Sequence, residues 1–456
     1  MHRLRPNPFI THTVAGFVAG AAASQPILED QALVPSTLIE ESGFGVSADS
    51  RGDIAVVGAN IRGTAASPAG AAFVYNYVDG EWFEHQTLTP SNGVAGDQFG
   101  RRVAVGESSI FVAAPTGGIG QGQVYVFELE DDMWVERQIL VASDGQAGRP
   151  FGVSIDVAGG VLVIGDDRAP GGGAAYIFEY DGSQWIETVK LTPSGNDSGD
   201  RYGNSVATNG HSVMVGAPGD DDTGRQSGAI YVYQNDGTGW NLSEKLYSAN
   251  PNQDNNLGDA LAMHGDYAMA STPGDAGSVG RVDCFRFDDP GWVSDGIIIE
   301  QPMPTNGRFG ESIAILHNRA VIGRLESKFP QGPGSAFVYT RTKQGWTLED
   351  QLISSTGADT DTFGRSVTVS THGIIVGANG DDDAGLSSGA AFAYNIMTRS
   401  DCLADTDQDG KLTMDDFNAW FMAYNKQLPW CDQNDDGSCT PTDFTAWIAN
   451  FNAGCP

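Results

Sequence analysis

The chain has 456 residues, of which 40% are hydrophobic, and its formal net charge is −33. Because this charge repels a polyanionic backbone, it argues against nucleic acid as a partner and makes cations the natural small ligands. Glycine is abundant at 60 residues and the apolar runs are short, which indicates an all-β body and excludes a membrane span of roughly 20 apolar residues.

Residues 1–23 have the pattern of a cleavable signal peptide. A basic head is followed by an apolar stretch, and the small residues Ala21 and Ala23 stand where a signal peptidase would cleave. We therefore expect an exported protein, either secreted or held at the cell surface.

Seven copies of one sequence unit occupy residues 27–398. Each copy contains an FG dipeptide or a close variant, and successive dipeptides are spaced 51 to 55 residues apart. Four strand patterns joined by turns make up one unit, and six of the seven copies carry a tryptophan after the third strand. Four antiparallel strands in each of seven units predict a seven-bladed β-propeller. The first residues of the dipeptides are Phe44, Phe99, Phe151, Tyr202, Leu257, Phe309 and Phe363.

The seventh copy ends near Asn395, before a fourth strand pattern. The N-terminal stretch "EDQALVPSTLIEESGFG" parallels "EDQLISSTGADTDTFG" of residues 349–364, which leads into the seventh copy. We therefore predict that the N-terminal segment supplies the missing strand. The ring would then have no open sheet edge between its first and last blades.

The phrases "FGVSAD", "AVVGAN", "VMVGAPGDDD" and "GAIYVY" resemble FG-GAP repeats, the units of the propeller in integrin alpha subunits and in many exported bacterial proteins. The resemblance implies a seven-bladed propeller. Integrin-like repeats carry a D-x-D-x-D-G calcium loop between their first two strands, and this sequence has only short turns there. Those metal sites are therefore not implied for this chain.

The short turn between the first and second strands contains two motifs that invite a functional reading. One is the tripeptide Arg51-Gly52-Asp53, and the other is a histidine in four consecutive copies. We interpret both as features of a repeated turn, in which glycine is favoured for its positive φ, rather than as an adhesion motif or a shared metal site. The histidines are His211, His264, His317 and His372.

Two loops between the second and third strands, "GAPGDDDTGRQSG" and "GANGDDDAGLSSG", are rich in aspartate and lie on the same predicted face. Oxygen ligands in a flexible loop suit weakly bound calcium. The alternative is that aspartate and glycine only form polar turns here. The candidate ligands are Asp220, Asp222, Asp381 and Asp383.

Residues 401–456 contain two acidic loops with the ligand spacing of an EF-hand, in which oxygen ligands occupy positions 1, 3, 5, 7, 9 and 12 and glycine occupies position 6. The spacing predicts two bound Ca²⁺ ions. In the first loop the ligands are Asp405, Asp407, Asp409, the carbonyl of Lys411, Thr413 and Asp416. In the second loop they are Asp432, Asn434, Asp436, the carbonyl of Ser438, Thr440 and Asp443.

Similar segments, "DFNAWFMAYN" and "DFTAWIANFN", follow the two acidic loops. Their aromatic residues recur at helical spacing, which predicts two helices with a small common core. This segment resembles a type I dockerin, the duplicated calcium module that docks exported bacterial proteins onto cohesins. The resemblance implies an anchoring protein partner. Loop positions 10 and 11 depart from the small hydroxyl residues common in dockerins, so the partner is either cohesin-like or another anchor.

Four of the five cysteines, Cys402, Cys431, Cys439 and Cys455, lie in the same segment, and such clustering in an exported module indicates disulfides. Four cysteines allow three pairings. We prefer Cys402 with Cys455 and Cys431 with Cys439. The fifth, Cys284, stands in an apolar strand pattern and is expected in the core.

The sequence contains no G-x-S-x-G elbow leading from a strand pattern into a helix pattern and no H-E-x-x-H helix. We therefore predict an exported, non-catalytic binding or scaffold protein, with a propeller that binds a ligand the sequence does not name and a calcium-dependent dockerin-like anchor. One alternative is an extracellular, polysaccharide-degrading hydrolase with its site on the propeller face. Another is a purely structural spacer.

Overall fold

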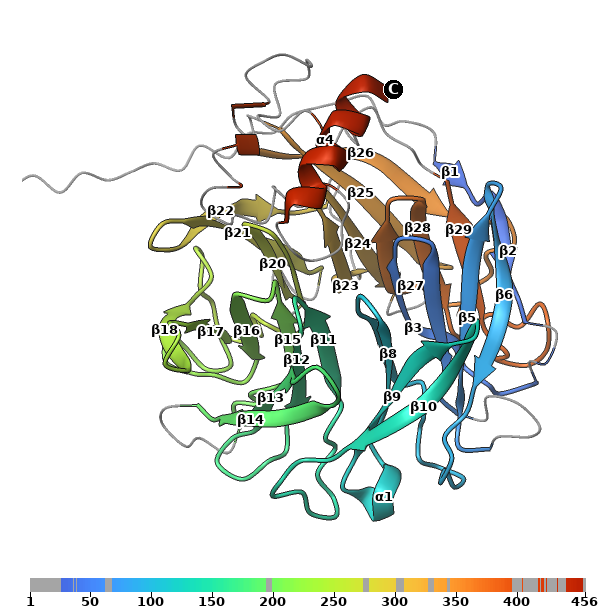
Figure 1. Ribbon diagram of the computed structural model, residues 1–456, viewed down its shortest axis with the longest axis horizontal. Helices are drawn as coiled ribbons and strands as arrows, with labels where there is room; N and C mark the ends of the chain where they lie inside the picture. The colour runs from blue at the N-terminus through green and yellow to red at the C-terminus, as the bar shows by residue number, and fades with distance from the viewer. Residues whose placement is uncertain are drawn as a thin grey trace, which may run out of the picture.

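The computed structural model describes most of the propeller region and a smaller part of the C-terminal region. The described residues are 26–35, 37, 39–61, 68–193, 199–273, 279–300, 307–326, 332–342, 345–395, 404, 417–418, 420–421, 424, 433 and 440–453. Within them the chain forms seven β-sheets around one central axis (Figure 1). This confirms the predicted seven-bladed, all-β propeller.

Blades 1 to 5 are four-stranded antiparallel sheets whose strands follow chain order from the axis outward. Blade 1 contains β3 (Phe44–Arg51), β4 (Ile54–Ala59), β5 (Ala71–Val78) and β6 (Glu81–Leu88), and blade 2 contains β7 (Arg102–Val105), β8 (Ser109–Ala114), β9 (Gln123–Glu130) and β10 (Met133–Leu140). Blade 3 contains β11 (Ser154–Ala158), β12 (Val161–Asp166), β13 (Ala174–Tyr180) and β14 (Trp185–Leu191). Blade 4 contains β15 (Ser205–Thr208), β16 (Ser212–Ala217), β17 (Ala229–Asn235) and β18 (Trp240–Leu246), and blade 5 contains β19 (Leu261–His264), β20 (Tyr267–Thr272), β21 (Arg281–Asp288) and β22 (Gly291–Ile298).

Blades 6 and 7 both include strands from the N-terminal segment. Blade 6 contains β23 (Gly307–Leu316), β24 (Arg319–Glu326), β25 (Ser335–Thr342) and β26 (Gly345–Ile353), and blade 7 contains β27 (Phe363–Ser370), β28 (Gly373–Ala378) and β29 (Ala390–Tyr394). The short strand β1 (Ile27–Leu28) adds to blade 6 in parallel with β26, which the sequence did not indicate. The strand β2 (Gln31–Leu33) pairs antiparallel with β29 and is the fourth strand of blade 7. The two ends of the propeller segment therefore meet in one sheet.

The seam between blades 7 and 1 uses the same pair of hydrogen bonds as the junction between blades 1 and 2. Gln31 of β2 donates from Nε2 to the carbonyl of Trp82 at 2.7 Å, and its Oε1 accepts from the Trp82 N–H at 2.9 Å. Gln86 makes the same pair of bonds with Trp134 in the next blade, at 2.9 and 2.7 Å. The N-terminal strand thus occupies the structural position of an ordinary fourth strand.

The first strands of the blades pack side by side in a closed ring around the axis, in the order β3, β7, β11, β15, β19, β23 and β27. The FG dipeptides lie at the start of these strands, and the side chains of their first residues are fully buried in all seven blades. The glycine is required because it adopts a positive φ against a neighbouring chain: Gly100 has φ +88°, and a Cβ there would lie 2.2 Å from the carbonyl oxygen of Ala71.

Aliphatic and aromatic side chains fill the spaces between adjacent blades. One such cluster joins Val56 and Leu88 of blade 1 to Tyr125 and Trp134 of blade 2. Cys284 is 1% exposed in the corresponding layer between blades 5 and 6, as expected for a core residue. The core of the protein is therefore a ring of inter-blade layers, and each blade depends on its neighbours for burial.

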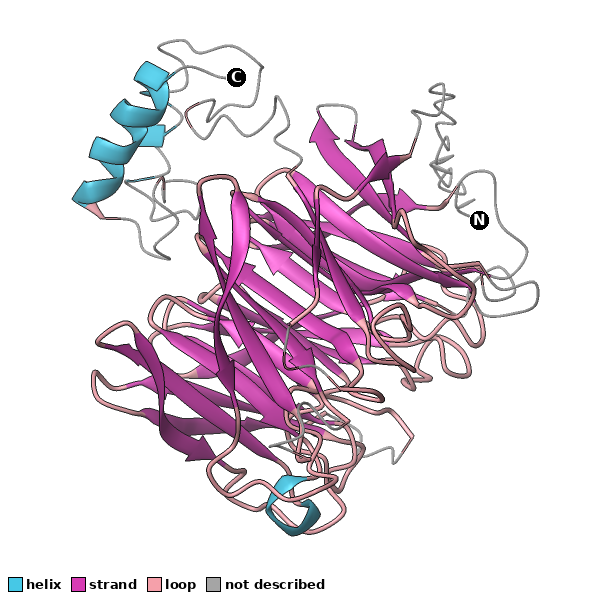
Figure 2. Cartoon of the chain, turned by 90° about the vertical axis from the view of Figure 1, so that its right-hand side faces the viewer, coloured by secondary structure: helices cyan, strands magenta, loops and turns pink. Residues whose placement is uncertain are grey.

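The C-terminal region contains the helix α4 (Pro441–Ala453), which lies beside the strand body in Figure 2. Phe417 packs against Phe444 and Trp447 with ring centroids 6.1 and 5.4 Å apart, and Trp447 is 6% exposed. These contacts join aromatic residues from the two similar segments that follow the acidic loops. In the described part of the chain, no helix has the length and apolarity to cross a membrane.

Several predicted features lie outside the described residues. They are the signal segment 1–23 and the four clustered cysteines Cys402, Cys431, Cys439 and Cys455 with their proposed pairings.

Candidate functional site

Most of the predicted calcium ligands of the C-terminal module also lie outside the described residues. These are Asp405, Asp407, Asp409, Lys411, Thr413, Asp416, Asp432, Asn434, Asp436 and Ser438. Of the remaining two, Asp443 is fully buried at the start of α4, where its Oδ2 accepts from the Thr440 N–H at 2.7 Å and its Oδ1 accepts from the Gln433 N–H at 2.9 Å. Thr440 and Asp443 thus form the capping arrangement of the helix.

The short turns between first and second strands connect neighbouring blades. Asp53 of the Arg51-Gly52-Asp53 turn approaches Nε2 of His372 in blade 7 at 2.5 Å, and the His372 ring stacks on Tyr77 with centroids 4.1 Å apart. The ring centroids of His264 and His317 lie 4.7 Å apart. A larger separation was expected, because the two histidines lie on turns of different blades. Among the described residues, no three histidine, cysteine or acidic side chains are grouped to hold a metal.

The two aspartate-rich loops differ in their surroundings. Beside the blade 4 loop, Nζ of Lys245 lies 2.5 Å from Oδ2 of Asp220 and 2.6 Å from Oδ2 of Asp222. The ammonium therefore takes the place between these carboxylates that a metal ion would need. The blade 7 loop, with Asp381 and Asp383, has no lysine or arginine paired to it in the described part of the chain.

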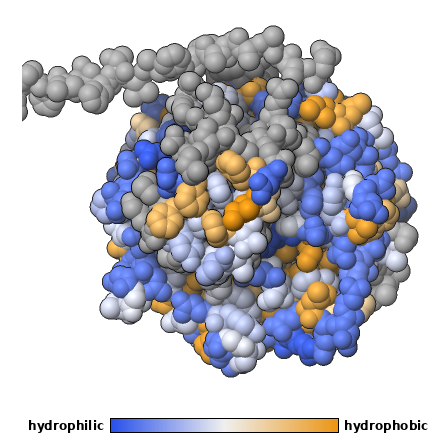
Figure 3. All heavy atoms as spheres, turned by 45° about the horizontal axis from the view of Figure 1, so that its top comes forward, coloured by the Kyte–Doolittle hydropathy of each residue, from blue (hydrophilic) through white to orange (hydrophobic). Residues whose placement is uncertain are grey.

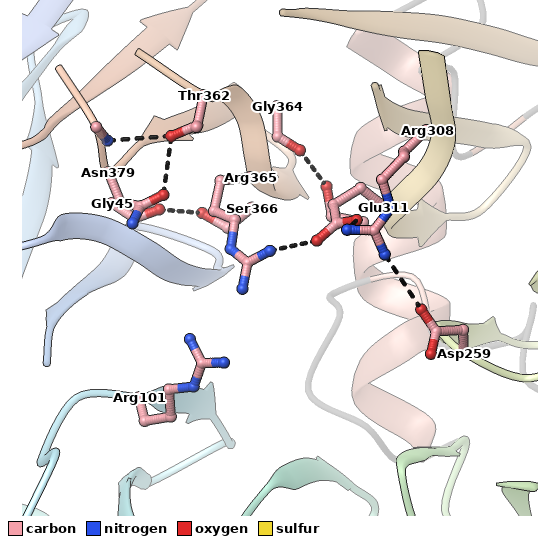
Figure 4. A network of polar contacts seen from close by, with 12 residues as sticks. Gly45, Arg101, Asp259, Arg308, Glu311, Thr362, Gly364, Arg365, Ser366 and Asn379 are labelled. Atoms are coloured by element: carbon pink, nitrogen blue, oxygen red, sulfur yellow. Dashed lines mark hydrogen bonds and ion pairs between the residues drawn. The ribbon is translucent and has the colours of Figure 1, made fainter. Parts of the chain in front are cut away.

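A second group of charges lies at the axis, where the residue after each FG glycine begins the ring of first strands. These residues are Val46, Arg101, Val153, Asn204, Asp259, Glu311 and Arg365. Those of blades 4 to 7 are linked from blade to blade: the Asn204 amide donates to the carbonyl of Asp259 at 2.8 Å, and Arg365 pairs with Glu311. Figure 4 shows Arg365, Glu311, Arg308 and Asp259 as one chain of polar contacts.

Charges alternate along this chain. Arg308 lies 3.1 Å from Oε2 of Glu311 and 4.0 Å from Oδ2 of Asp259, and Arg201 lies 4.0 Å from Asp259 and 3.5 Å from Asp167. Glu311 is nearly buried, since its side chain is 9% exposed. Glu311 and Asp259 each lie near two arginines, and Asp167 lies near one. The positive and negative charges in this part of the axis therefore nearly balance.

Arg101 and Arg102 of blade 2 add two positive charges that this chain does not neutralise. In the described part of the chain neither guanidinium forms an ion pair, and Nη1 of Arg102 donates only to the Arg101 carbonyl, at 3.2 Å. Figure 4 shows Arg101 directed toward Arg365, away from the dashed contacts. We call Arg101, Arg102 and Arg365 the axial arginine cluster.

Burial and mutual repulsion both act on the axial arginine cluster. The pKa of Arg102 is lowered to about 9, first by burial and then by the positive charges of Arg101 and Arg365, and the carboxylates of Glu311 and Asp259 offset only part of this effect. The pKa of Arg101 is lowered for the same reasons, first by burial and then by Arg365. An anion placed among these guanidinium groups would relieve the repulsion, and their planar forks match the oxygen pairs of carboxylate, phosphate and sulfate groups.

Two further carboxylates on the innermost strands have perturbed pKa values. Burial raises the pKa of Asp49 to about 6 and that of Asp156 to about 7. Oδ2 of Asp49 accepts from the Val105 N–H at 2.7 Å, and Oδ2 of Asp156 accepts from the Thr208 N–H at 2.7 Å. Both side chains therefore tie one first strand to another, which is a structural task.

The sequence contained a signal for the axial arginine cluster that the repeat analysis missed. Three residues after the first residue of the dipeptide, five blades have serine, whose Oγ donates to the carbonyl of the next FG glycine. These serines are Ser47, Ser154, Ser205, Ser312 and Ser366. Blade 2 has Arg102 and blade 5 has Ala260 at this position, so the cluster departs from the repeat at a place where five blades are hydrogen-bonded to the next.

One face of the molecule is mainly hydrophilic (Figure 3). In the face shown in Figure 3, apolar residues form small patches separated by hydrophilic ones. Such single apolar residues are usual on soluble surfaces and do not indicate a docking face. The axial arginine cluster is therefore the candidate ligand site.

Comparisons with known proteins agree with the repeat. Residues 82–127, 134–178, 185–233 and 346–394 match the family model described as FG-GAP repeat, and each match runs from the tryptophan strand of one blade to the third strand of the next. No curated protein matches the chain. One similar crystal structure is described as a putative 6-phosphogluconolactonase from Bacteroides uniformis ATCC 8492; it is 14% identical, with a TM-score of 0.47 over 68% of this chain and 85% of that one. A likeness this distant says nothing about activity. The chain carries FG-GAP repeats, and they belong to a seven-bladed β-propeller.

Proposed function

We propose that the protein is an exported, non-catalytic binding or scaffold protein whose propeller holds an anionic group of its ligand at the axial arginine cluster. The observation that carries the proposal is the pair Arg101 and Arg102, half-buried at the axis without an ion pair in the described structure. The protein as a whole is strongly acidic, with a net charge of −33. A local excess of positive charge in such a protein favours a specific anion over general attraction of polyanions.

The alternative of an extracellular hydrolase has less support. A hydrolytic site would need carboxyl groups free to act on substrate. The two axial carboxylates with raised pKa, Asp49 and Asp156, are instead bonded to backbone N–H groups of other first strands. The FG-GAP propeller is in general a binding fold, in agreement with a binding role.

We also propose that residues 401–456 are a dockerin-like anchor that binds two Ca²⁺ ions through the two loops and attaches the propeller to a cohesin-like or other protein. The packing of Phe417 against Phe444 and Trp447 supports the duplicated design. If this is right, the double variant D405N/D432N binds two fewer calcium ions than the wild type in equilibrium dialysis. Unchanged calcium stoichiometry in the variant would contradict the anchor.

Arg102→Ser tests the anion site, because it installs the residue that five other blades have at this position. The new hydroxyl can donate to the carbonyl of Gly152, as Ser47 does to Gly100, so the variant is expected to fold with stability equal to the wild type or about 1 kcal/mol higher. We expect its affinity for glucuronate and for inorganic sulfate, measured by titration calorimetry, to fall at least about tenfold.

Arg137→Ala is the matched control, because Arg137 pairs with Glu130 on the exposed outer side of blade 2 and is 42% exposed. It should leave anion binding unchanged. Equal affinity in the wild type and in Arg102→Ser would remove the axial arginine cluster as the site. Absence of binding by the wild type at millimolar sulfate and glucuronate would count against an anionic ligand altogether.

A further inference from the structure

Blades 3 to 6 each pair a carboxylate with a cation near the start of the third strand. The distances are 2.7 Å between Lys190 and Asp144, 2.5 Å between Lys245 and Asp220, 3.2 Å between Arg281 and Asp283, and 2.5 Å between Arg324 and Glu300. A buried carboxylate is tolerated when such a partner and hydrogen bonds satisfy it. Blade 7 has the aspartate of the blade 4 loop, Asp381, but none of its described lysines or arginines is paired with it.

The loops of blades 4 and 7 are the same structure with nearly the same sequence, "GDDDTGRQSG" at 219–228 and "GDDDAGLSSG" at 380–389. The Gly228 N–H donates to the carbonyl of Asp220 at 2.9 Å, and the Gly389 N–H donates to that of Asp381 at 2.9 Å. Oδ1 of each aspartate accepts from the N–H two residues later at 3.2 Å. Asp220 and Asp381 are both 2% exposed, so the two loops can be compared residue by residue.

In blade 4 the second oxygen of the buried aspartate is fully satisfied. Oδ2 of Asp220 receives the ammonium of Lys245 at 2.5 Å and the hydroxyl of Tyr231 at 3.0 Å. The same ammonium reaches Oδ2 of Asp222 at 2.6 Å. One positive centre therefore lies between the buried and the exposed carboxylate of this loop.

In blade 7 the residues at those two positions are apolar. Lys245 stands opposite Tyr231 in the pairing of β18 with β17, and the corresponding pair in β2 and β29 is Ala32 opposite Phe392. Oδ2 of Asp381 is consequently buried with no hydrogen-bond partner among the residues that the structure describes.

Ser388 has lost a partner in the same way. In blade 4, Oγ of Ser227 lies 2.8 Å from Oγ1 of Thr223, and in blade 7 the threonine is replaced by Ala384. Oγ of Ser388 is therefore also buried, and no described residue forms a hydrogen bond with it. Blade 4 supplies three polar partners, Lys245, Tyr231 and Thr223, and blade 7 has apolar residues at all three positions. Leaving buried oxygens without hydrogen bonds lowers the stability of the folded state.

We propose that a hard metal cation, Ca²⁺ by the chemistry of its ligands, occupies in blade 7 the place that the Lys245 ammonium takes in blade 4, between Asp381 and Asp383. All available ligands are oxygens, which suits Ca²⁺. The exposed Asp383 gives the ion access from solvent. Because no three acidic side chains of the described chain are grouped around one point, the remaining ligands are Ser388, loop carbonyls and water.

The competing occupant is a proton on Asp381. Burial raises the pKa of this carboxyl to about 6, and the nearby charges of Asp361, Asp383 and Asp382 act in the same direction. Asp361 is itself buried, so its carboxylate adds negative charge close to the site. Neutral pH lies above this pKa, so the carboxylate is mainly ionised there, and the same negative charges attract a divalent cation.

Ala32→Lys and Asp381→Asn test the proposal in the full chain. The first installs the cation of blade 4, and the second removes the buried charge with little change of shape. In equilibrium dialysis at neutral pH, each variant should bind one calcium ion fewer than the wild type. Calcium should raise the melting temperature of the wild-type propeller and not that of Ala32→Lys, which should be the more stable protein in EDTA.

The C-terminal loops do not confuse the result, because the comparison is between variants that share them, and the background D405N/D432N removes their ions. A crystal grown with calcium should show an ion 2.3 to 2.6 Å from Oδ2 of Asp381. Equal calcium stoichiometry in the wild type and in Asp381→Asn would overturn the proposal, as would a calcium-grown crystal with only water or nothing at this oxygen. Asp381→Asn carries the test if Ala32→Lys fails to fold.

Discussion

Blades 4 and 7 each contain an acidic loop of nearly the same sequence, but different side chains surround the two loops. In blade 4 the fourth strand comes next in the chain and brings Lys245 to Asp220. In blade 7 the fourth strand comes from the N-terminus and brings Ala32 to the same place. The chemistry of a repeated loop therefore depends on the strand that packs beside it, because a buried carboxylate depends on its neighbours for charge and hydrogen bonds.

The largest expected effect comes from giving blade 4 the composition of blade 7. Lys245→Met keeps the length of the side chain and removes the ammonium, which leaves Asp220 buried and facing Asp222. Because breaking a buried ion pair leaves an uncompensated charge, we expect the free energy of unfolding in EDTA to fall by about 3–5 kcal/mol. Calcium should recover part of this loss and should bind at one additional site.

Arg137→Met is the control for this variant, since it breaks an exposed pair worth about 0–1 kcal/mol. Chemical denaturation with and without calcium measures both proteins. If Lys245→Met unfolds like Arg137→Met, the buried pair of blade 4 does not hold its loop together and the comparison between the blades fails.

A smaller effect is expected in the pH dependence of blade 7. The pKa of Asp381 is about 6 in the folded protein against an ordinary value of 3.8, mainly because of burial. A carboxyl with a raised pKa binds its proton more tightly in the folded state, so its contribution favours folding at low pH and is lost as the pH rises from about 4 to about 6. The slope is at most about 1.4 kcal/mol per pH unit.

Asp381→Asn should lack this part of the pH dependence when unfolding is followed in EDTA. Asp49 and Asp156 also have raised pKa values, but they are present in both proteins, so the difference between the two curves isolates Asp381. Calcium competes with the proton on Asp381, so it should flatten the wild-type curve between about pH 4 and pH 6. Parallel curves for the wild type and the variant would show that Asp381 does not titrate as its burial requires.

Much of the fold could be predicted from the sequence, because the alignment of seven repeat copies shows which strand each segment forms. The FG dipeptides marked the start of the innermost strands, and all seven of their first residues are fully buried. The strand β1 was missed, since two residues have no periodicity to detect. The acidic loops could be recognised from their composition. Lys245 could not, because its role depends on contacts with Asp220 and Asp222, which lie more than 20 residues away in the sequence.

The axial arginine cluster was missed for a different reason. Arg101 and Arg102 look like ordinary surface residues in the sequence, and only a comparison with the serines of five other blades shows that Arg102 is unusual. Even that comparison does not show that Arg365 of blade 7 lies near them. Their proximity follows from the closure of the ring, which brings the first strands of separate blades around one axis.

The sequence by itself determined the number of blades, the place of the turns and the residues of the inter-blade core, because these depend on local periodicity and on where apolar side chains recur. Tertiary structure alone decided which charges meet. Within the described structure Asp220 is paired with a lysine, Asp381 is not, and Arg365 of blade 7 lies near Arg101, since electrostatic partners are set by distances between blades and by burial rather than by spacing along the chain.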